Sequence, residues 1–204
     1  DLAKLEPLRE HRVESLFLLS RFDEIRNLQQ FEINEIFFFN RIWSQASTQA
    51  FFSANTSGFE ALKSSGVLNR LQGSGLEQLL SRYFDYVNQI RVLETALNNN
   101  LVSVNTELRQ QQPKELVPWA IINPSALSQK QFQDSQPLFA EFINSPTAAA
   151  MVESQFRNRP LVLLYDSLTV IGEAFIKAVE SGQLETPVAM PRTRLDDVRD
   201  GLGP

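Results

Sequence analysis

The sequence predicts an all-α protein: an antiparallel helical bundle with two long helices, several shorter ones and coiled-coil-like packing. Three observations support this class. A heptad ladder of apolar side chains occupies the middle of the chain. A second helical apolar pattern, with no Gly or Pro between Leu8 and Phe52, fills the first quarter. No alternating run of β-branched residues bounded by turns occurs anywhere.

The heptad ladder predicts the longest helix. Its side chains follow one another at alternating steps of four and three residues, which places them on one stripe: Leu76, Leu80, Tyr83, Val87, Ile90, Glu94, Leu97, Leu101, Val104 and Leu108. Ser74 and Glu77 form a capping box that begins this helix, and Pro113 ends it near Gln112. Glu94 alone breaks the apolar pattern, and Leu93 can take up part of the stripe.

The first segment, from Leu2 to about Phe52, is expected to be one long helix after Pro7, because apolar residues recur at steps of three to five. The stretch from Ile36 to Phe39 is apolar on all sides and should be enclosed by more than one neighbour. A break follows at Asn55, and Ser57 with Glu60 forms a second capping box for a short helix that Gly66 ends.

Shorter elements complete the predicted bundle. Residues 113–135, with three prolines, form a crossing connection, and helices follow at 137–144, 146–157 and 160–181, the last of them capped by Gly182. The segment 183–204 is rich in Pro, Gly and charge. The predicted organisation is therefore a helical bundle domain over 1–182 and an extended C-terminal tail over 183–204.

Composition excludes several functional classes. The chain has 204 residues, a net charge of −5 and a pI of about 5.0, and its Lys and Arg are scattered, which argues against a nucleic-acid partner. It has no cysteine, so thiolate chemistry and disulfides are excluded, and this absence fits the cytosol and a bacterial periplasm equally well. The longest apolar stretch, 160–179, carries three charges, too many for a membrane span.

A start at Asp1 rather than Met leads us to expect that a signal peptide, an anchor or a designed truncation lies upstream. The stretch from Phe59 to Leu71, followed by Leu76 to the pair Tyr83-Phe84, resembles the DUF6090-like family of bacterial membrane-anchored proteins of unknown function, which has two tyrosines at this pair. The resemblance covers the central third of the chain. It implies an N-terminal membrane helix, absent here, and a helical domain held outside the inner membrane, with no catalytic residue to carry over.

No catalytic, cofactor or metal site is predicted. His11, the one histidine, lies near Glu10 and Glu14, but Leu8 stands where a carboxylate-bridged metal site would need Glu, so a solvated charged face is the simpler interpretation. Ser74 lacks the context of a nucleophile and is assigned to capping. An enzyme would need an acid–base pair that the fold alone brings together.

Five residues are candidate contacts for a ligand or partner: Phe38, Trp43, Tyr83, Glu94 and Arg91. The aromatic residues form either core or a pocket between the long helices, with core favoured. Glu94 either pins the register or senses a ligand, paired with Arg91, or sits at the edge of the stripe and reaches water, the interpretation favoured here.

The predicted function is a non-enzymatic interaction or sensing domain, with a protein partner or self-association, facing the periplasm from an inner-membrane anchor or, alternatively, cytoplasmic. The competing prediction is a sensor that binds a small ligand in an aromatic pocket.

Overall fold

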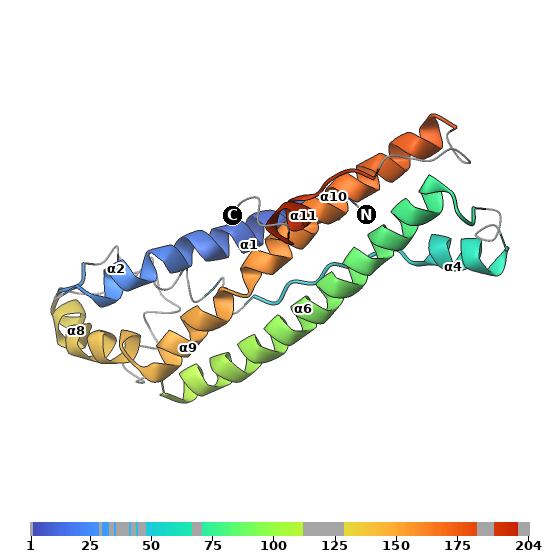
Figure 1. The fold of residues 1–204 in the computed structure, drawn as a ribbon. Coiled ribbons are helices and arrows are strands. Elements are labelled where there is room, and N and C mark those ends of the chain that lie inside the picture. The colour runs from blue at the N-terminus through green and yellow to red at the C-terminus, as the bar shows by residue number, and fades with distance from the viewer. Residues whose placement is uncertain are drawn as a thin grey trace. The chain divides into compact units, whose positions relative to one another are not determined.

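The described part of the chain is helical for most of its length and contains no β-strand, which confirms the predicted all-α class (Figure 1). The structure is a computed structural model and describes residues 2–28, 30–32, 35, 41, 44, 48–66, 71–111, 129–182 and 190–199. Its helices are η1 (Leu2–Lys4), α1 (Leu5–Ser20), α2 (Phe22–Arg26), α4 (Ser57–Ser64), α6 (Gly75–Gln111), α8 (Gln129–Ile143), α9 (Pro146–Gln155), α10 (Asn158–Glu180) and α11 (Arg194–Arg199). None of these helices combines the length and apolar character that crossing a membrane requires.

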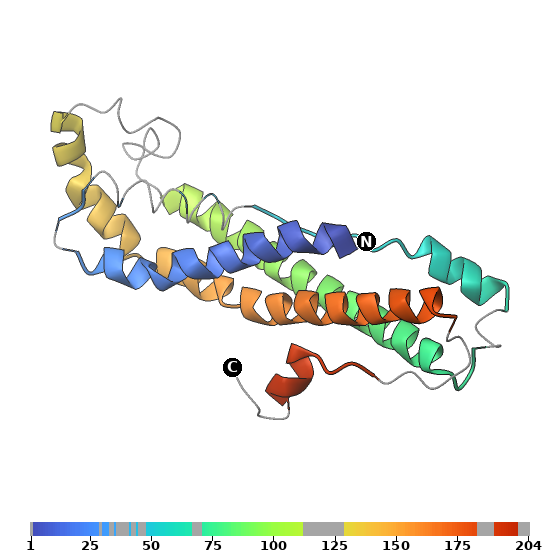
Figure 2. The ribbon, with the colours of Figure 1, turned by 90° about the horizontal axis from the view of Figure 1, so that it is seen from above.

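The prediction of one helix from Leu2 to Phe52 is wrong. Helix α1 ends at Ser20, α2 ends at Arg26, and residues 48–56 are non-helical and lead into α4 (Figure 2). Side chains from distant elements take over the backbone groups that a helix would have paired. Gln136 binds both the N–H and the C=O of Phe31, with the N–H donating to its amide oxygen at 3.0 Å, and Glu94 accepts the N–H of Phe52. Apolar periodicity alone could not reveal these contacts.

Helix α4 begins differently from the prediction and ends as predicted. Its N-cap is Thr56, whose side chain accepts no capping hydrogen bond, and the N–H of Ser57 donates to the side chain of Asn55 at 3.1 Å. The predicted capping box of Ser57 and Glu60 is therefore wrong. The side chain of Asn55 accepts hydrogen bonds from both the N–H and the hydroxyl of Ser57 instead. Gly66, at φ 71°, takes the left-handed conformation that closes the helix.

Helix α6 spans the predicted heptad ladder. The hydroxyl of Ser74 accepts the N–H of Glu77 at 3.2 Å, while the Glu77 carboxylate accepts the N–H of Gly73 at 2.6 Å. The capping box is present, but its return bond reaches one residue further back. The apolar ladder residues of α6 with the least exposure are Leu76, Leu80, Ile90, Leu97 and Leu101. The predicted stop at Pro113 lies outside the described residues.

Helices α9 and α10 match their predictions, and α8 is longer than predicted. The hydroxyl of Ser145 caps α9 by accepting the N–H of Ala148 at 3.1 Å. Gly182, at φ 69°, follows α10. Helix α8 begins at Gln129, so Pro137 lies inside it rather than at its start. Pro137 has no N–H to donate to the preceding turn of α8, and Gln136 beside it makes the side-chain contact with Phe31.

The chain divides into two compact units, each with its own buried residues. The first contains residues 1–10, 51–94 and 160–204, and the second contains residues 11–50 and 95–159. In the second unit, the rings of Phe31 and Phe139 meet edge to face at 4.8 Å. Its described core includes Leu18, Phe22, Ile25, Phe31, Phe139, Phe142, Ile143, Ala148, Met151 and Val152. The first buries Leu79, Leu161, Leu168 and Ile171, among others.

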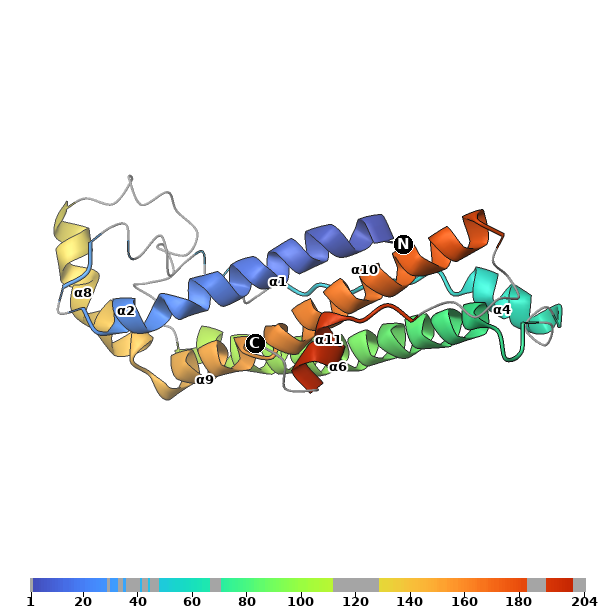
Figure 3. The same cartoon turned by 45° about the horizontal axis from the view of Figure 1, so that its top comes forward.

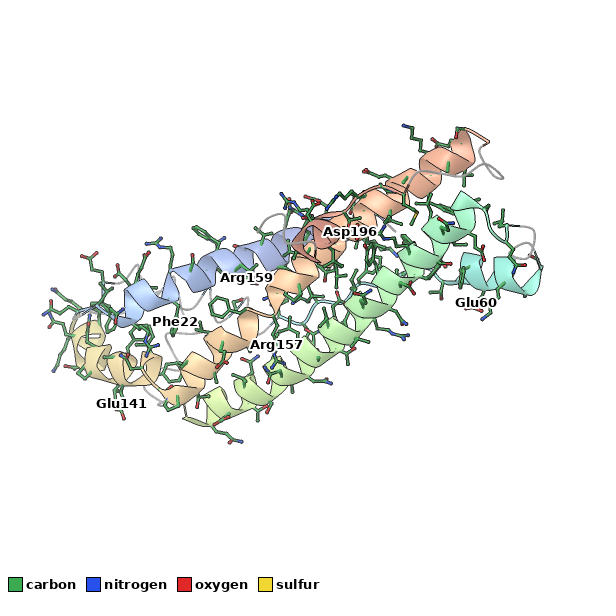
Figure 4. All side chains as sticks on the ribbon, in the orientation of Figure 1. Phe22, Glu60, Glu141, Arg157, Arg159 and Asp196 are labelled. Atoms are coloured by element: carbon green, nitrogen blue, oxygen red, sulfur yellow. The ribbon has the colours of Figure 1, made fainter. Side chains whose placement is uncertain are left out.

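The segment predicted as an extended tail contains a helix. Residues 190–193 are non-helical and lead into α11 (Figure 3). Thr193 and Asp196 cap α11 reciprocally, at 3.0 and 3.3 Å, and Asp196, labelled in Figure 4, forms an ion pair with Arg82 of α6. Arg194 reaches Asp166 of α10 at 3.3 Å. These charge contacts hold α11 against α6 and α10, although the composition of the segment predicts an extended tail. Residues 183–189 and 200–204 lie outside the description.

Candidate functional site

The first unit contains a cavity of about 500 Å³, here named the aromatic cavity. Helices α4, α6 and α10 all contribute to it, together with η1. Its described lining residues are Leu2, Gly58, Phe59, Leu80, Tyr83, Phe84, Gly172, Phe175 and Ile176. The volume falls within the range of about 300–1,000 Å³ that is usual for sites that bind small molecules.

Aromatic rings form one wall of the aromatic cavity. The rings of Phe59 on α4 and Phe84 on α6 lie 3.9 Å apart between centroids, at 30°. The ring of Tyr83 meets that of Phe84 edge to face, at 5.3 Å and 79°. Each aromatic side chain offers a large apolar surface at low conformational cost, so the wall suits an apolar ligand.

Tyr83 provides the one polar side-chain atom among the described lining residues. Burial raises the pKa of the Tyr83 phenol, because the charged form is poorly solvated there. The phenol therefore stays protonated at neutral pH and can donate a hydrogen bond. Within the described part of the chain it makes none.

Gly172 lets the N-terminal segment approach α10. A Cβ atom built on Gly172 would lie 2.6 Å from Cδ2 of Leu2 and 3.2 Å from its Cδ1. Any larger side chain at this position would displace Leu2 from the lining. Glycine at position 172 thus allows the side chain of Leu2 to form part of the wall.

Of the five residues proposed as contacts, the structure describes three, Tyr83, Arg91 and Glu94. Tyr83 lines the aromatic cavity, whereas Phe38 and Trp43 lie outside the described residues. Arg91 is exposed and donates to the side chain of Asn88 at 2.7 Å, and no bond is described between it and Glu94. The pairing of Glu94 with Arg91 is therefore not found.

Glu94 is buried, with 1% of its surface exposed, so the favoured interpretation that it reaches water is wrong. Its carboxylate accepts the backbone N–H of Phe52 and the hydroxyl of Tyr165 on α10. We call these three residues the Glu94 cluster. The buried carboxylate is tolerated because strong donors satisfy it, and the heptad stripe that places Glu94 inward was the signal for its burial.

His11 lies on α1, next to Arg12 and one turn before Glu14. Burial is the main cause that lowers the pKa of its imidazole, the charge of Arg12 adds to this, and Glu14 opposes it. Glu14 forms an ion pair with Arg41. No group of three or more metal-binding side chains occurs among the described residues.

Sequence reasoning missed most of the aromatic cavity. Phe175 belongs to the predicted apolar stripe of the last helix, and Phe59 belongs to the stretch that resembles the DUF6090-like family. Neither pattern indicates that the two rings share a cavity, because that depends on where α4 packs. No family model, curated protein or solved structure matches this chain.

Proposed function

We propose that the first unit binds a small apolar molecule in the aromatic cavity, and that the protein acts as a non-enzymatic sensor or carrier of this ligand. The observation that carries the proposal is the cavity itself, whose described lining is apolar except for the Tyr83 hydroxyl. Transfer of an apolar ligand from water to such a surface is favourable by about 25 cal/mol per Å² buried.

The proposal includes a packing arrangement in which α6 and α10 form an antiparallel, coiled-coil-like pair within a helical bundle. The opposite courses of residues 75–94 and 160–180 in Figures 1 and 3 support this. The hydrogen bond between Glu94 on α6 and Tyr165 on α10 supports it as well. A cavity between such helices is a usual place for a ligand in a bundle.

A substitution that fills the cavity tests the proposal. Ile176 lines the cavity and is 47% exposed, so Ile176→Trp can fold while its larger side chain obstructs the site. Val179 lies on the same helix and is 45% exposed but is not among the lining residues, which makes Val179→Trp the matched control. The probe is the neutral fluorescent dye N-phenyl-1-naphthylamine.

We expect the wild-type protein and the Val179→Trp variant to bind the dye with a similar Kd, and the Ile176→Trp variant to bind it at least tenfold more weakly. Urea denaturation confirms that all three proteins are folded. If the dye binds none of them, or binds the Ile176→Trp variant as well as the wild type, the proposed function is wrong.

A protein partner or self-association is the second candidate, and one observation favours it. Val13 and Phe17 lie one helical turn apart on α1, and Phe17 is 60% exposed. Adjacent exposed apolar side chains of this size are typical of contact surfaces. Light scattering across a tenfold dilution tests this: a dimer that Phe17→Ser dissociates would support it, and a monomer at all concentrations would contradict self-association.

The periplasmic location and the relationship to the DUF6090-like family are also proposals. They rest on the resemblance of the stretch from Phe59 to Leu71, which includes the helix end at Gly66. Protein expressed from the complete gene should fractionate with the inner membrane and be degraded by protease added to spheroplasts. Recovery in the cytosolic fraction would overturn this location.

A further inference from the structure

We propose that the aromatic cavity selects a neutral ligand with one hydrogen-bond acceptor, such as an alcohol or a ketone on an apolar body, and that the Tyr83 hydroxyl binds that acceptor. This inference rests on the proposed function and specifies its ligand class. Two observations support the inference: the described lining has no charged side chain, and the Tyr83 hydroxyl makes no hydrogen bond within the described part of the chain.

The absence of charged side chains from the described lining limits the class of ligand. None of the described lining residues is Asp, Glu, His, Lys or Arg. A carboxylate or ammonium group that entered the cavity would give up its water without gaining a partner of opposite charge. Such a transfer is strongly unfavourable, so fatty acids and amines should be rejected in their charged forms.

The single polar side-chain atom of the described lining determines which head group the cavity can bind. The Tyr83 hydroxyl has no hydrogen-bond partner within the described part of the chain, and burial raises the pKa of the phenol. The group is therefore a donor through the physiological range. The edge-to-face contact with Phe84 fixes the ring at the cavity wall. A ligand hydroxyl or carbonyl oxygen is its natural complement.

The shape of the aromatic cavity suits the apolar body of the ligand. Phe59 and Phe84 offer one broad ring surface. Leu80 of α6 and Phe175 and Ile176 of α10 add aliphatic and aromatic side chains to the lining. The cavity is nonpolar over most of its surface and about 500 Å³ in volume. The apolar body of the ligand supplies the affinity, and the hydrogen bond to Tyr83 supplies the selectivity.

A series of six-carbon compounds that differ only in the head group tests the inference. The compounds are 1-hexanol, hexanoate, hexylammonium and n-hexane, measured at pH 8 by displacement of N-phenyl-1-naphthylamine. We expect 1-hexanol to bind at least tenfold more tightly than either charged compound. Tyr83→Phe should weaken 1-hexanol about 3- to 10-fold and leave n-hexane unchanged, because only the alcohol uses the hydroxyl.

A second variant tests the charge argument independently. Ile176→Lys adds a cation at an exposed lining position, so it should raise the affinity for hexanoate at least tenfold relative to 1-hexanol. Val179→Lys adds the same charge outside the lining and should leave that ratio unchanged. Both positions tolerate a long polar side chain because both are exposed.

The outcomes separate the two proposals. If the dye does not bind, the proposed function fails. If the dye binds but hexanoate displaces it as well as 1-hexanol does, or Tyr83→Phe leaves 1-hexanol unaffected, the neutral-ligand inference is overturned while the proposed function stands.

Discussion

The two carboxylate oxygens of Glu94 accept the backbone N–H of Phe52 at 3.0 and 2.8 Å, and this contact fixes the non-helical segment before α4 against α6. Tyr165 of α10 donates its hydroxyl to the same carboxylate. One buried acid thus joins three parts of the first unit that lie far apart in sequence. Because hydrogen bonds to a charged acceptor are strong in a buried site, the Glu94 cluster should contribute substantially to stability.

The first prediction is that Glu94→Gln lowers the free energy of unfolding by about 1.5–3 kcal/mol. The amide keeps the shape of the side chain but loses the charge and one of the two acceptor oxygens. Urea denaturation at pH 7 measures the change. The control is Arg91→Ala, an exposed substitution one turn away on the same helix, which should change stability by less than about 0.5 kcal/mol.

A double-mutant cycle with Tyr165→Phe tests the cluster itself. Tyr165→Phe removes the hydroxyl, and Glu94→Gln replaces the carboxylate that accepts its hydrogen bond, so the double variant should lose less than the sum of the two, with a coupling of about 0.5–3 kcal/mol. Strict additivity would show that the hydroxyl and the carboxylate act independently.

The second prediction concerns the charge contacts of the C-terminal segment. Burial alone would raise the pKa of Asp196, but hydrogen bonds from the backbone and hydroxyl of Thr193 and the contact with Arg82 outweigh it, so the pKa is lowered. Asp196→Asn should destabilise the protein by about 1–2 kcal/mol at pH 7. The control is Asp197→Asn, which disrupts only an exposed ion pair with Arg192 and should cost less than about 0.5 kcal/mol.

The effect of Asp196→Asn should depend on pH in a defined direction. A lowered pKa in the folded state means that the contribution of Asp196 is complete above its unfolded value, about 3.9, and is lost as the pH falls through the folded value. The difference between wild type and variant in urea denaturation should therefore be constant from pH 7 to about pH 5 and shrink below about pH 4. A difference that is unchanged at acid pH would contradict the assigned role.

The third prediction is a pH dependence caused by the single histidine. The pKa of His11 is lowered by burial and by Arg12, so below about pH 6.5 the unfolded chain takes up a proton before the folded protein does. Stability should fall as the pH decreases from about 6.5 towards the folded pKa. In the His11→Gln variant this slope should disappear, and urea midpoints that fall equally in both proteins would rule out His11 as the cause.

The fourth prediction concerns the contact between Leu2 and Gly172. Alanine is a better helix former than glycine by about 1 kcal/mol, but at position 172 its Cβ would collide with the side chain of Leu2. Gly172→Ala should therefore be more favourable in a Leu2→Ala background than in the wild type, by up to about 1 kcal/mol, because the colliding atoms are the ends of a flexible side chain that can move at small cost. The four urea denaturation curves measure this difference, and equal effects in both backgrounds would show that Leu2 does not pack on Gly172.

The sequence by itself determined the elements whose signals are local. The heptad stripe and the residues from Gly73 to Glu77 predict the course and start of α6, because apolar spacing and capping act within a few residues. Gly66 and Gly182 predict helix ends for the same reason, since only the backbone conformation of one residue is involved. The all-α class follows from such signals.

The tertiary structure alone decided where the secondary structure departs from these local signals. Residues 48–56 are non-helical, and Glu94 binds the backbone of Phe52 within them. Helix α8 begins before Pro137, at Gln129, and Gln136 binds Phe31. Tyr83 was a candidate from sequence, yet its unused hydroxyl and the rings of Phe59 and Phe84 became a site only through the packing of α4 on α6. A cavity is a property of distances between elements, and the spacing of residues within one helix does not record those distances.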